Sequence, residues 1–262
     1  VTVSLGWSEG DSIGAIAWVA IALGAIVIPL LLSSVPEGTE RSDRTREENQ
    51  SLSDSLQALG RNQPFLRLLS AWFLNGVANG IPAALFFLYL EHGLGAGEDI
   101  RPLFVLSYFV AAIVSIPLWL RLSRRIGKHR TWCWGMIAAC IAFVSVPWID
   151  SGNFALFGIV CVVTGMALGA DLALPPALQA DVTDYAKLRS GRAQTGLQFA
   201  LWGMSTKLAL AVAVGLALPG LEIAGFDPEI PSDAGRQALI VIYALIPVVI
   251  KVMTILVVWR FP

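Results

Sequence analysis

Apolar and polar positions are arranged along this chain in long blocks, each apolar block being followed by a short charged connection. A bilayer core about 30 Å thick is crossed by a helix of about 20 apolar residues. Stretches such as AIAWVAIALGAIVIPLLL reach this length without the strict alternation of a membrane β-barrel. The pattern therefore predicts an all-α polytopic membrane protein, with spans at about 13–35, 66–90, 102–120, 131–149, 154–181, 195–221 and 238–259.

The charge of the connections changes sign from one end of the spans to the other. Basic residues gather in the connections near 36–63, 121–130 and 182–194, and acidic residues gather near 91–101, 150 and 222–236. Because the cytoplasmic loops of membrane proteins carry an excess of Lys and Arg, the basic connections and the C-terminus are predicted to face the cytoplasm. The expected location is a bacterial inner (plasma) membrane, which the chain crosses several times.

Composition and motifs narrow the function classes. Only 14% of the residues are charged and the formal net charge is −1, so no basic stripe is available for nucleic acid. Cys133, Cys140 and Cys161 lie inside apolar runs, at spacings that fit neither a zinc site nor a disulfide framework. The sequence contains no nucleophile elbow, His-rich metal motif or P-loop, which predicts no enzyme, no metal and no cofactor. An ion gradient is therefore the expected energy source rather than ATP.

Ionisable residues inside predicted spans are costly and mark candidate functional sites. Asp171 and Lys207 are predicted to reach similar depths near the middle of the membrane, on consecutive spans. They are interpreted either as charges that line a water-filled cavity, where they contact a solute or relay a proton, or as a structural ion pair. Lys251 is the third such candidate, and a structural role is favoured over a functional one, because its long side chain can extend along the helix toward the membrane surface.

Two asparagines in the 66–90 span are further candidates. Asn75 and Asn79 are four residues apart, so both amides face one side of their helix, and Gly76 and Gly80 beside them allow close approach. We expect the two amides to line the cavity; hydrogen bonding to a neighbouring helix is the alternative.

Two acidic residues near the predicted cytoplasmic end point to a gate. Asp181 and Asp184 share one helix face, and negative charge at a helix C-terminus is unfavourable with the helix dipole. Arg189, Arg192 or the basic connection near 121–130 is expected to offset this charge. Such a cluster would act as a gate if it broke and reformed during transport, and a solvated helix end is the alternative.

The stretch ALQADVTDYAKLRSGRAQTGLQFALWGMSTKL carries a family resemblance. Its elements Ala180-Asp181, Asp184-Tyr185, Gly191-Arg192 and Lys207 resemble a motif of the glycoside–pentoside–hexuronide (GPH):cation symporters, a major facilitator superfamily group that includes melibiose carriers. RNQPFLRLLSAWFLNG, at 61–76, is similar to the entry into that family's seventh helix. The connection LRLSRRIGKHR resembles a degenerate form of the superfamily's basic loop, with Arg125 kept and Arg124 in the usual place of an aspartate.

The resemblance implies a major-facilitator-type helix bundle with two six-helix halves around a central cavity. Residues 1–35 would be the last helix of the N-terminal half, 36–63 the central cytoplasmic loop, and 64–262 the C-terminal six-helix bundle. The chain would then need an N-terminal half that it lacks. The resemblance also implies that Lys207 lies near the substrate and cation sites, and that Asp181 and Asp184 belong to the cytoplasmic gate together with Arg192 and Arg125.

The predicted function is secondary-active symport of a solute with Na⁺ or H⁺, by alternating access between two helix bundles. A sugar or glycoside is the solute that the resemblance implies, and a lysolipid or another organic solute of the same family is the alternative. A non-transporting, truncated membrane module is the alternative from another class. The expected partners are a small-molecule solute, a cation and the lipid bilayer.

Overall fold

The structure, a computed structural model, describes all residues except 1–8, 35–56, 58, 191–194, 231 and 262. The chain separates into two compact units, Val1–Gln50 and Ser51–Pro262, each of which is described by itself. The described part of the first unit is one helix, α2 (Glu9–Ser34), which contains Pro29. Its segment Ala17–Ser34 is long and apolar enough to cross a membrane.

The second unit is helical throughout, and no strand occurs among its described residues. Its first spans are α5 (Gln63–Leu88) with the π-helical turn η1 (Tyr89–Gly93), α6 (Arg101–Ile126), and α7 (Lys128–Ser145) with the 3₁₀ turn η2 (Val146–Trp148). The others are α8 (Phe154–Ser190), α9 (Thr195–Ile223), and one continuous span of α10 (Asp233–Ile240), the π-helical turn η3 (Val241–Leu245) and α11 (Ile246–Trp259). Seven spans in the described residues are long and apolar enough to cross a membrane, which confirms the predicted all-α membrane fold.

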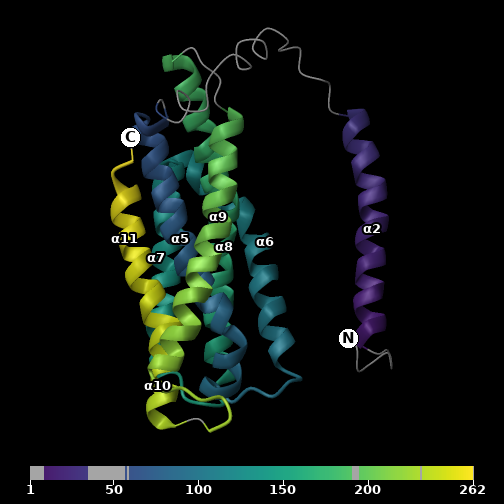
Figure 1. The fold of residues 1–262 in the computed structure, drawn as a ribbon, viewed down its shortest axis with the longest axis vertical. Helices are drawn as coiled ribbons and strands as arrows, with labels where there is room; N and C mark the ends of the chain where they lie inside the picture. Colours follow the sequence, from purple (N-terminus) through teal and green to yellow (C-terminus); the bar gives the residue numbers. More distant parts are fainter. Residues whose placement is uncertain (1–8, 35–56, 58, 191–194, 231, 262) are drawn as a thin grey trace. The chain divides into compact units, whose positions relative to one another are not determined.

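The spans of the second unit run alongside one another and are joined at their ends (Figure 1). α8 packs against α6 and α7, α9 packs against α5, and α11 packs against both α5 and α7. One short connection shows why the sequence turns where it does: α6 ends and α7 begins at Gly127, whose φ of 91° favours glycine. We call the end of the bundle that contains Gly127 and Asp181 the basic end.

Small residues let α6 and α8 approach closely. Gly165 lies against the backbone of Tyr108, and Gly169 lies against Ala112 and Ser115. Two side chains of α6 donate to one α8 carbonyl: Ser115 Oγ lies 3.2 Å and Trp119 Nε1 lies 2.7 Å from the oxygen of Met166. Interfaces of this kind, with small residues one turn apart, are typical of helix pairs in membranes.

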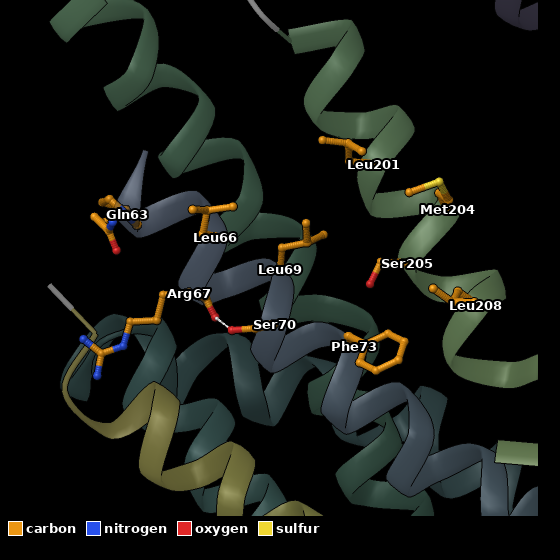
Figure 2. Close-up of a pocket in the computed structure, with 11 residues that line it drawn as sticks. Gln63, Leu66, Arg67, Leu69, Ser70, Phe73, Leu201, Met204, Ser205 and Leu208 are labelled. Atoms are coloured by element: carbon orange, nitrogen blue, oxygen red, sulfur yellow. Dashed lines mark hydrogen bonds between the residues drawn. The ribbon is translucent and has the colours of Figure 1, made fainter. Parts of the chain in front are cut away.

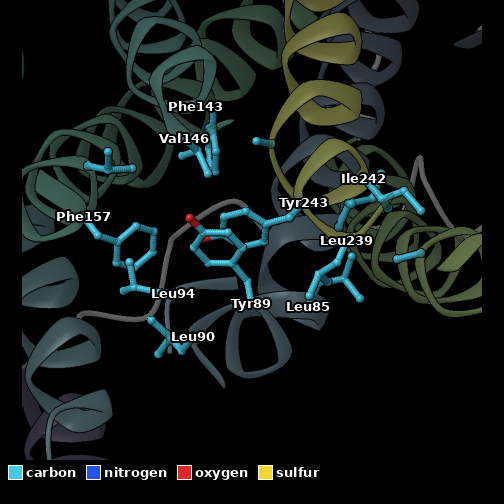
Figure 3. Close-up of a cluster of buried hydrophobic side chains, with 14 of the residues drawn as sticks. Leu85, Tyr89, Leu90, Leu94, Phe143, Val146, Phe157, Leu239, Ile242 and Tyr243 are labelled. Atoms are coloured by element: carbon cyan, nitrogen blue, oxygen red, sulfur yellow. The ribbon is translucent and has the colours of Figure 1, made fainter. Parts of the chain in front are cut away.

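The buried apolar residues form two clusters, one toward each end of the bundle. We call the first the tyrosine cluster, because Tyr89 and Tyr243 stack at its centre with ring centroids 4.3 Å apart and planes 3° from parallel (Figure 3). These two tyrosines come from the two π-helical turns, η1 and η3. We call the second the tryptophan cluster, and it contains Phe65, Trp119 and Trp132 toward the basic end.

Candidate functional site

Asp171 is a buried carboxylate in the middle of α8. Asp171 is 5% exposed to solvent, and both of its carboxylate oxygens accept hydrogen bonds from neighbouring helices. Trp132 Nε1, on α7, donates to Oδ1 at 2.6 Å, and Asn79 Nδ2, on α5, donates to Oδ2 at 2.8 Å. Hydrogen bonds to a charged acceptor are roughly twice as strong as those between neutral groups, so these two contacts hold the carboxylate firmly in place.

Lys251 supplies the positive charge beside this carboxylate. It comes from α11, and its Nζ lies 4.0 Å from Asp171 Oδ2 and donates to Asn75 Oδ1, on α5, at 2.8 Å. Lys251 and Asn75 are each 1% exposed. The expectation that Lys251 extends toward the membrane surface is therefore wrong, because its ammonium group is held inside the bundle by a carboxylate and an amide oxygen.

Asp171, Lys251, Asn75, Asn79 and Trp132 together form what we call the buried charge network. Four helices contribute to it, and it lies where the tyrosine and tryptophan clusters meet. Along α5, for example, Ala71 belongs to the tryptophan cluster and Val77 to the tyrosine cluster, with Asn75 between them. A buried charge is tolerated only when it is paired and hydrogen-bonded, and this network meets both conditions for Asp171.

A cavity of about 240 Å³ opens beside the network. Asn79, Asp171 and Lys251 form its most polar part, and Tyr108, Thr164 and Tyr243 add hydroxyl groups. The rest of the lining is apolar and comes from α5, α6, α7 and α8: Pro82, Ala83, Phe86, Phe87, Val105, Phe109, Ala139, Phe143, Val160, Cys161, Ala167 and Leu168. The cavity is thus amphipathic, with charge on one part of its wall and aromatic surface on the other.

A wider groove, of about 920 Å³, lies between α5 and α9 (Figure 2). Its walls are mainly apolar, with Leu66, Leu69 and Phe73 on one side facing Leu201, Met204 and Leu208 on the other. The charged group at its edge, Arg67, turns toward α11, where it donates to the carbonyl oxygens of Val257 and Arg260 at 2.7 and 2.9 Å. The groove therefore lacks the converging polar groups that distinguish the smaller cavity.

The predicted cavity residues fall into two sets. Asp171 and Asn79 line the cavity, and Asn75 belongs to the network without being among the lining residues, since its amide oxygen accepts from Lys251 on a neighbouring helix. Lys207 is exposed on α9. The cation beside Asp171 is thus Lys251 instead of Lys207, and the role of Lys207 stays a prediction. Sequence reasoning also missed Trp132, which lies in an apolar run with no signal of a polar contact. Lys251 did carry a signal, because it is a charge inside a span.

At the basic end, Asp181 forms an ion pair. Lys128 Nζ lies 2.6 Å from Asp181 Oδ2. The partner of Asp181 therefore comes from the basic connection near 121–130, and it is Lys128. Asp184 and Arg125 are exposed, and Arg192 lies outside the described residues. The ion pair places α7 and α8 in contact at the end where a gate was predicted, and the gating role itself stays a prediction.

We expect the Lys128–Asp181 pair to contribute little to stability. The two side chains are 38% and 57% exposed, and solvent-exposed ion pairs contribute about 0–1 kcal/mol. Asp181→Asn should therefore lower the free energy of unfolding by less than about 1 kcal/mol, and by less still in 1 M salt. Unfolding curves in detergent at low and high salt measure this, and a loss of several kcal/mol would show that the pair is a structural clamp.

The described residues contain no group of three or more His, Cys, Asp or Glu side chains placed to hold a metal ion. The buried charge network offers hydrogen bonding and charge from a carboxylate, an ammonium group and two amides.

Comparison with known proteins gives a family and several relatives. Residues 4–262 match a family described as MFS/sugar transport protein. The chain is 25% identical, over 237 residues, to sodium-dependent lysophosphatidylcholine symporter 1-A of Danio rerio; the match covers 89% of this chain and 44% of the relative. It is 27% identical over 169 residues to the sphingosine-1-phosphate transporter MFSD2B of Xenopus tropicalis, covering 64% of this chain and 32% of the relative.

A bacterial relative is also similar. The chain is 21% identical, over 213 residues, to the glucuronide carrier protein homolog of Escherichia coli (strain K12), and the match covers 81% of this chain and 47% of that protein. The chain thus spans less than half the length of each of these three relatives. All three are named as symporters, transporters or carriers rather than enzymes.

Proposed function

The chain belongs to the MFS/sugar transport protein family, and we propose that it works in a secondary-active symporter, where a Na⁺ or H⁺ gradient drives an organic solute across the membrane by alternating access. Family membership and the membrane spans together make it an integral, multi-pass membrane protein of the major facilitator type. We place the basic end and the C-terminus on the cytoplasmic side of a bacterial inner membrane, on the basis of the Lys/Arg distribution.

The observation that carries the proposal is the buried charge network beside a cavity. Charged side chains inside membrane spans are rare and commonly mark substrate or ion pathways. Asp171 and Lys251 are buried, and apolar residues of similar volume at these positions would often give equal or greater stability. Packing alone therefore does not account for the two charges. Both also line the cavity, where a solute would meet them.

Two solute classes have support. A lysolipid is favoured by the aromatic and aliphatic part of the cavity wall, which includes Phe86, Phe87 and Phe109, and by the lysophosphatidylcholine and sphingosine-1-phosphate carriers among the relatives. A sugar or glycoside is favoured by the family's description and by the glucuronide carrier among the relatives. The cavity wall has features that suit both classes, because aromatic side chains line one part of it and Asn79, Asp171 and Lys251 line another.

The Lys128–Asp181 pair is the proposed cytoplasmic gate, together with Asp184, Arg125 and Arg192. Gating requires the pair to break and reform as helices move, which a half-exposed pair can do at small energetic cost. Reversing one charge (Asp181→Lys) is expected to reduce uptake, and reversing both (Lys128→Asp with Asp181→Lys) to restore much of it. Equal uptake in the single variant and the wild type would remove the pair from the cycle.

Gradient-driven uptake tests the proposed function. The full-length gene product that contains residues 1–262 is placed in proteoliposomes, and uptake of labelled lysolipids, glycosides, pentosides and hexuronides is followed under imposed Na⁺ or H⁺ gradients. We expect uptake of one class with one ion, and its reduction to the level of protein-free vesicles in Lys207→Ala. Unchanged uptake in that variant would remove Lys207 from the solute and cation sites, and uptake of nothing would favour the non-transporting module.

A further inference from the structure

We propose that Lys251 and Asn75 form a binding site for an anionic oxygen group, a carboxylate or a phosphate, on the solute. This inference rests on the proposed function and names the part of the solute that the buried charge network recognises. It assigns to Lys251, on α11, a binding role distinct from that predicted for Lys207, on α9.

Lys251 has more hydrogen-bond donors than its neighbours accept from. An ammonium group has three N–H donors, and Lys251 uses one of them, toward Asn75 Oδ1, in a hydrogen bond within the described residues. Its distance of 4.0 Å to Asp171 Oδ2 is too long for a hydrogen bond. Hydrogen bonds from Trp132 and Asn79 hold the carboxylate of Asp171 in this position, where it accepts no hydrogen bond from Lys251.

The side-chain amide of Asn75, beside Lys251, has an unpaired donor. Because an ammonium group only donates, the oxygen of Asn75 must face Lys251, and this fixes the orientation of the amide. Asn75 Nδ2 is then left without a hydrogen-bond partner among the described residues, although the side chain is 1% exposed. A buried donor without an acceptor costs about 1–3 kcal/mol, which an oxygen atom of a ligand would recover.

The charge around Lys251 also favours an anionic group. Without a ligand, Asp171 neutralises Lys251 from 4.0 Å while it is held away by two other donors. The positive charge of the ammonium group is therefore balanced by Asp171, but two of its three N–H donors have no acceptor among the described residues. An anionic oxygen of a ligand would supply that acceptor. A cationic or neutral group would gain less here, because the unused groups of Lys251 and Asn75 are donors.

The cavity supplies the path and the remaining contacts. Lys251 lies in its wall, and the apolar part of the same wall includes Phe86 and Phe109. A solute with an acidic group at one end and a nonpolar or ring-shaped body at the other fits this arrangement. A carboxylate and a phosphate both offer anionic oxygen atoms that accept hydrogen bonds. The binding measurements below distinguish between these two groups.

Binding measurements with matched ligands test the inference. The purified full-length gene product, in lipid nanodiscs, is titrated with labelled lauroyl-lysophosphatidic acid against monolauroylglycerol, and with p-nitrophenyl glucuronide against p-nitrophenyl glucoside. Within each pair the two ligands share the apolar body and differ at the anionic group. We expect the anionic member of one pair to bind about tenfold more tightly or better, and the pair that responds identifies phosphate or carboxylate.

Variants assign the preference to a residue. Lys251→Met combined with Asp171→Asn removes both charges, which avoids an unpaired buried charge, and it should bring the two members of the pair to equal affinity. Lys251→Arg with Asp171 intact should keep the anion preference. Equal binding within both pairs for the wild type, a preference that survives the double variant, or a preference lost only in Lys207→Met would each overturn the inference.

The proposed function can fail separately from this inference. If the anionic ligand binds through Lys251 but no ion gradient drives its uptake, symport is contradicted and the binding site stands. If uptake occurs without discrimination between the members of a pair, symport stands and the anion site is contradicted.

Discussion

Asp171→Leu is expected to lower the free energy of unfolding by about 3–5 kcal/mol, because it leaves the ammonium of Lys251 buried without a counter-charge. The same change removes the acceptor of Trp132 Nε1–H and Asn79 Nδ2–H, which adds to the loss. Reversible unfolding of the protein in mixed detergent micelles, followed by helical circular dichroism, measures the effect.

A double-mutant cycle separates the ion pair from general packing damage. Lys251→Met alone should also destabilise, whereas Asp171→Leu combined with Lys251→Met should recover most of the loss, since apolar residues of similar volume often replace a buried pair without penalty. If the loss of stability in the double variant equals the sum of the losses in the two single variants, the two charges do not depend on each other, in spite of their 4.0 Å separation. Recovery of stability without recovery of anion binding would show that the network is kept for function.

Gly169→Ala is expected to lower the free energy of unfolding by about 1–3 kcal/mol, the usual cost of overpacking. A Cβ atom at this position would overlap Ser115 Oγ and lie 2.5 Å from the carbonyl oxygen of Ala112, so the backbone of α6 must move away. The movement would also weaken the contacts of Ser115 and Trp119 with the carbonyl of Met166.

Gly158→Ala on the same helix is the matched control. The nearest heavy atom to its added Cβ, Phe104 Cε1, is 4.0 Å away, so the methyl group fits. Alanine is favoured over glycine inside a helix by about 1 kcal/mol, and this variant should be unchanged or slightly more stable. If both variants lose stability equally, the cause is not the α6–α8 contact.

The sequence predicted the spans well because the requirement for a span is local. Each stretch must offer about 20 apolar residues, and composition alone reports that. The same local reasoning put Asp171 inside a span, and it lies within the apolar helix α8. The two asparagines of α5 were also predicted to face one side of their helix, because residues four apart lie on one helix face, and both join the network although only Asn79 lines the cavity.

The sequence did not identify the partners of these groups. Lys207 was the natural partner for Asp171, because it lies on the next span at a similar depth, yet it is exposed on α9. The partner is Lys251, which comes from the last span, and its direction was predicted wrongly because a lysine side chain is long enough to point either way. Trp132 gave no warning, since a tryptophan in an apolar run looks the same whether or not its N–H has an acceptor.

By itself, then, the sequence determined that this chain is a helical membrane protein, roughly where it crosses the bilayer, and which residues place charge inside the membrane. Those properties depend on residue type and on regular helix geometry. Only the tertiary structure decided that Asp171, Lys251 and Asn75 meet beside a cavity while Lys207 does not, and that the partner of Asp181 is Lys128. Such contacts depend on how each helix is rotated and which helix packs beside it, and close packing between distant segments fixes both.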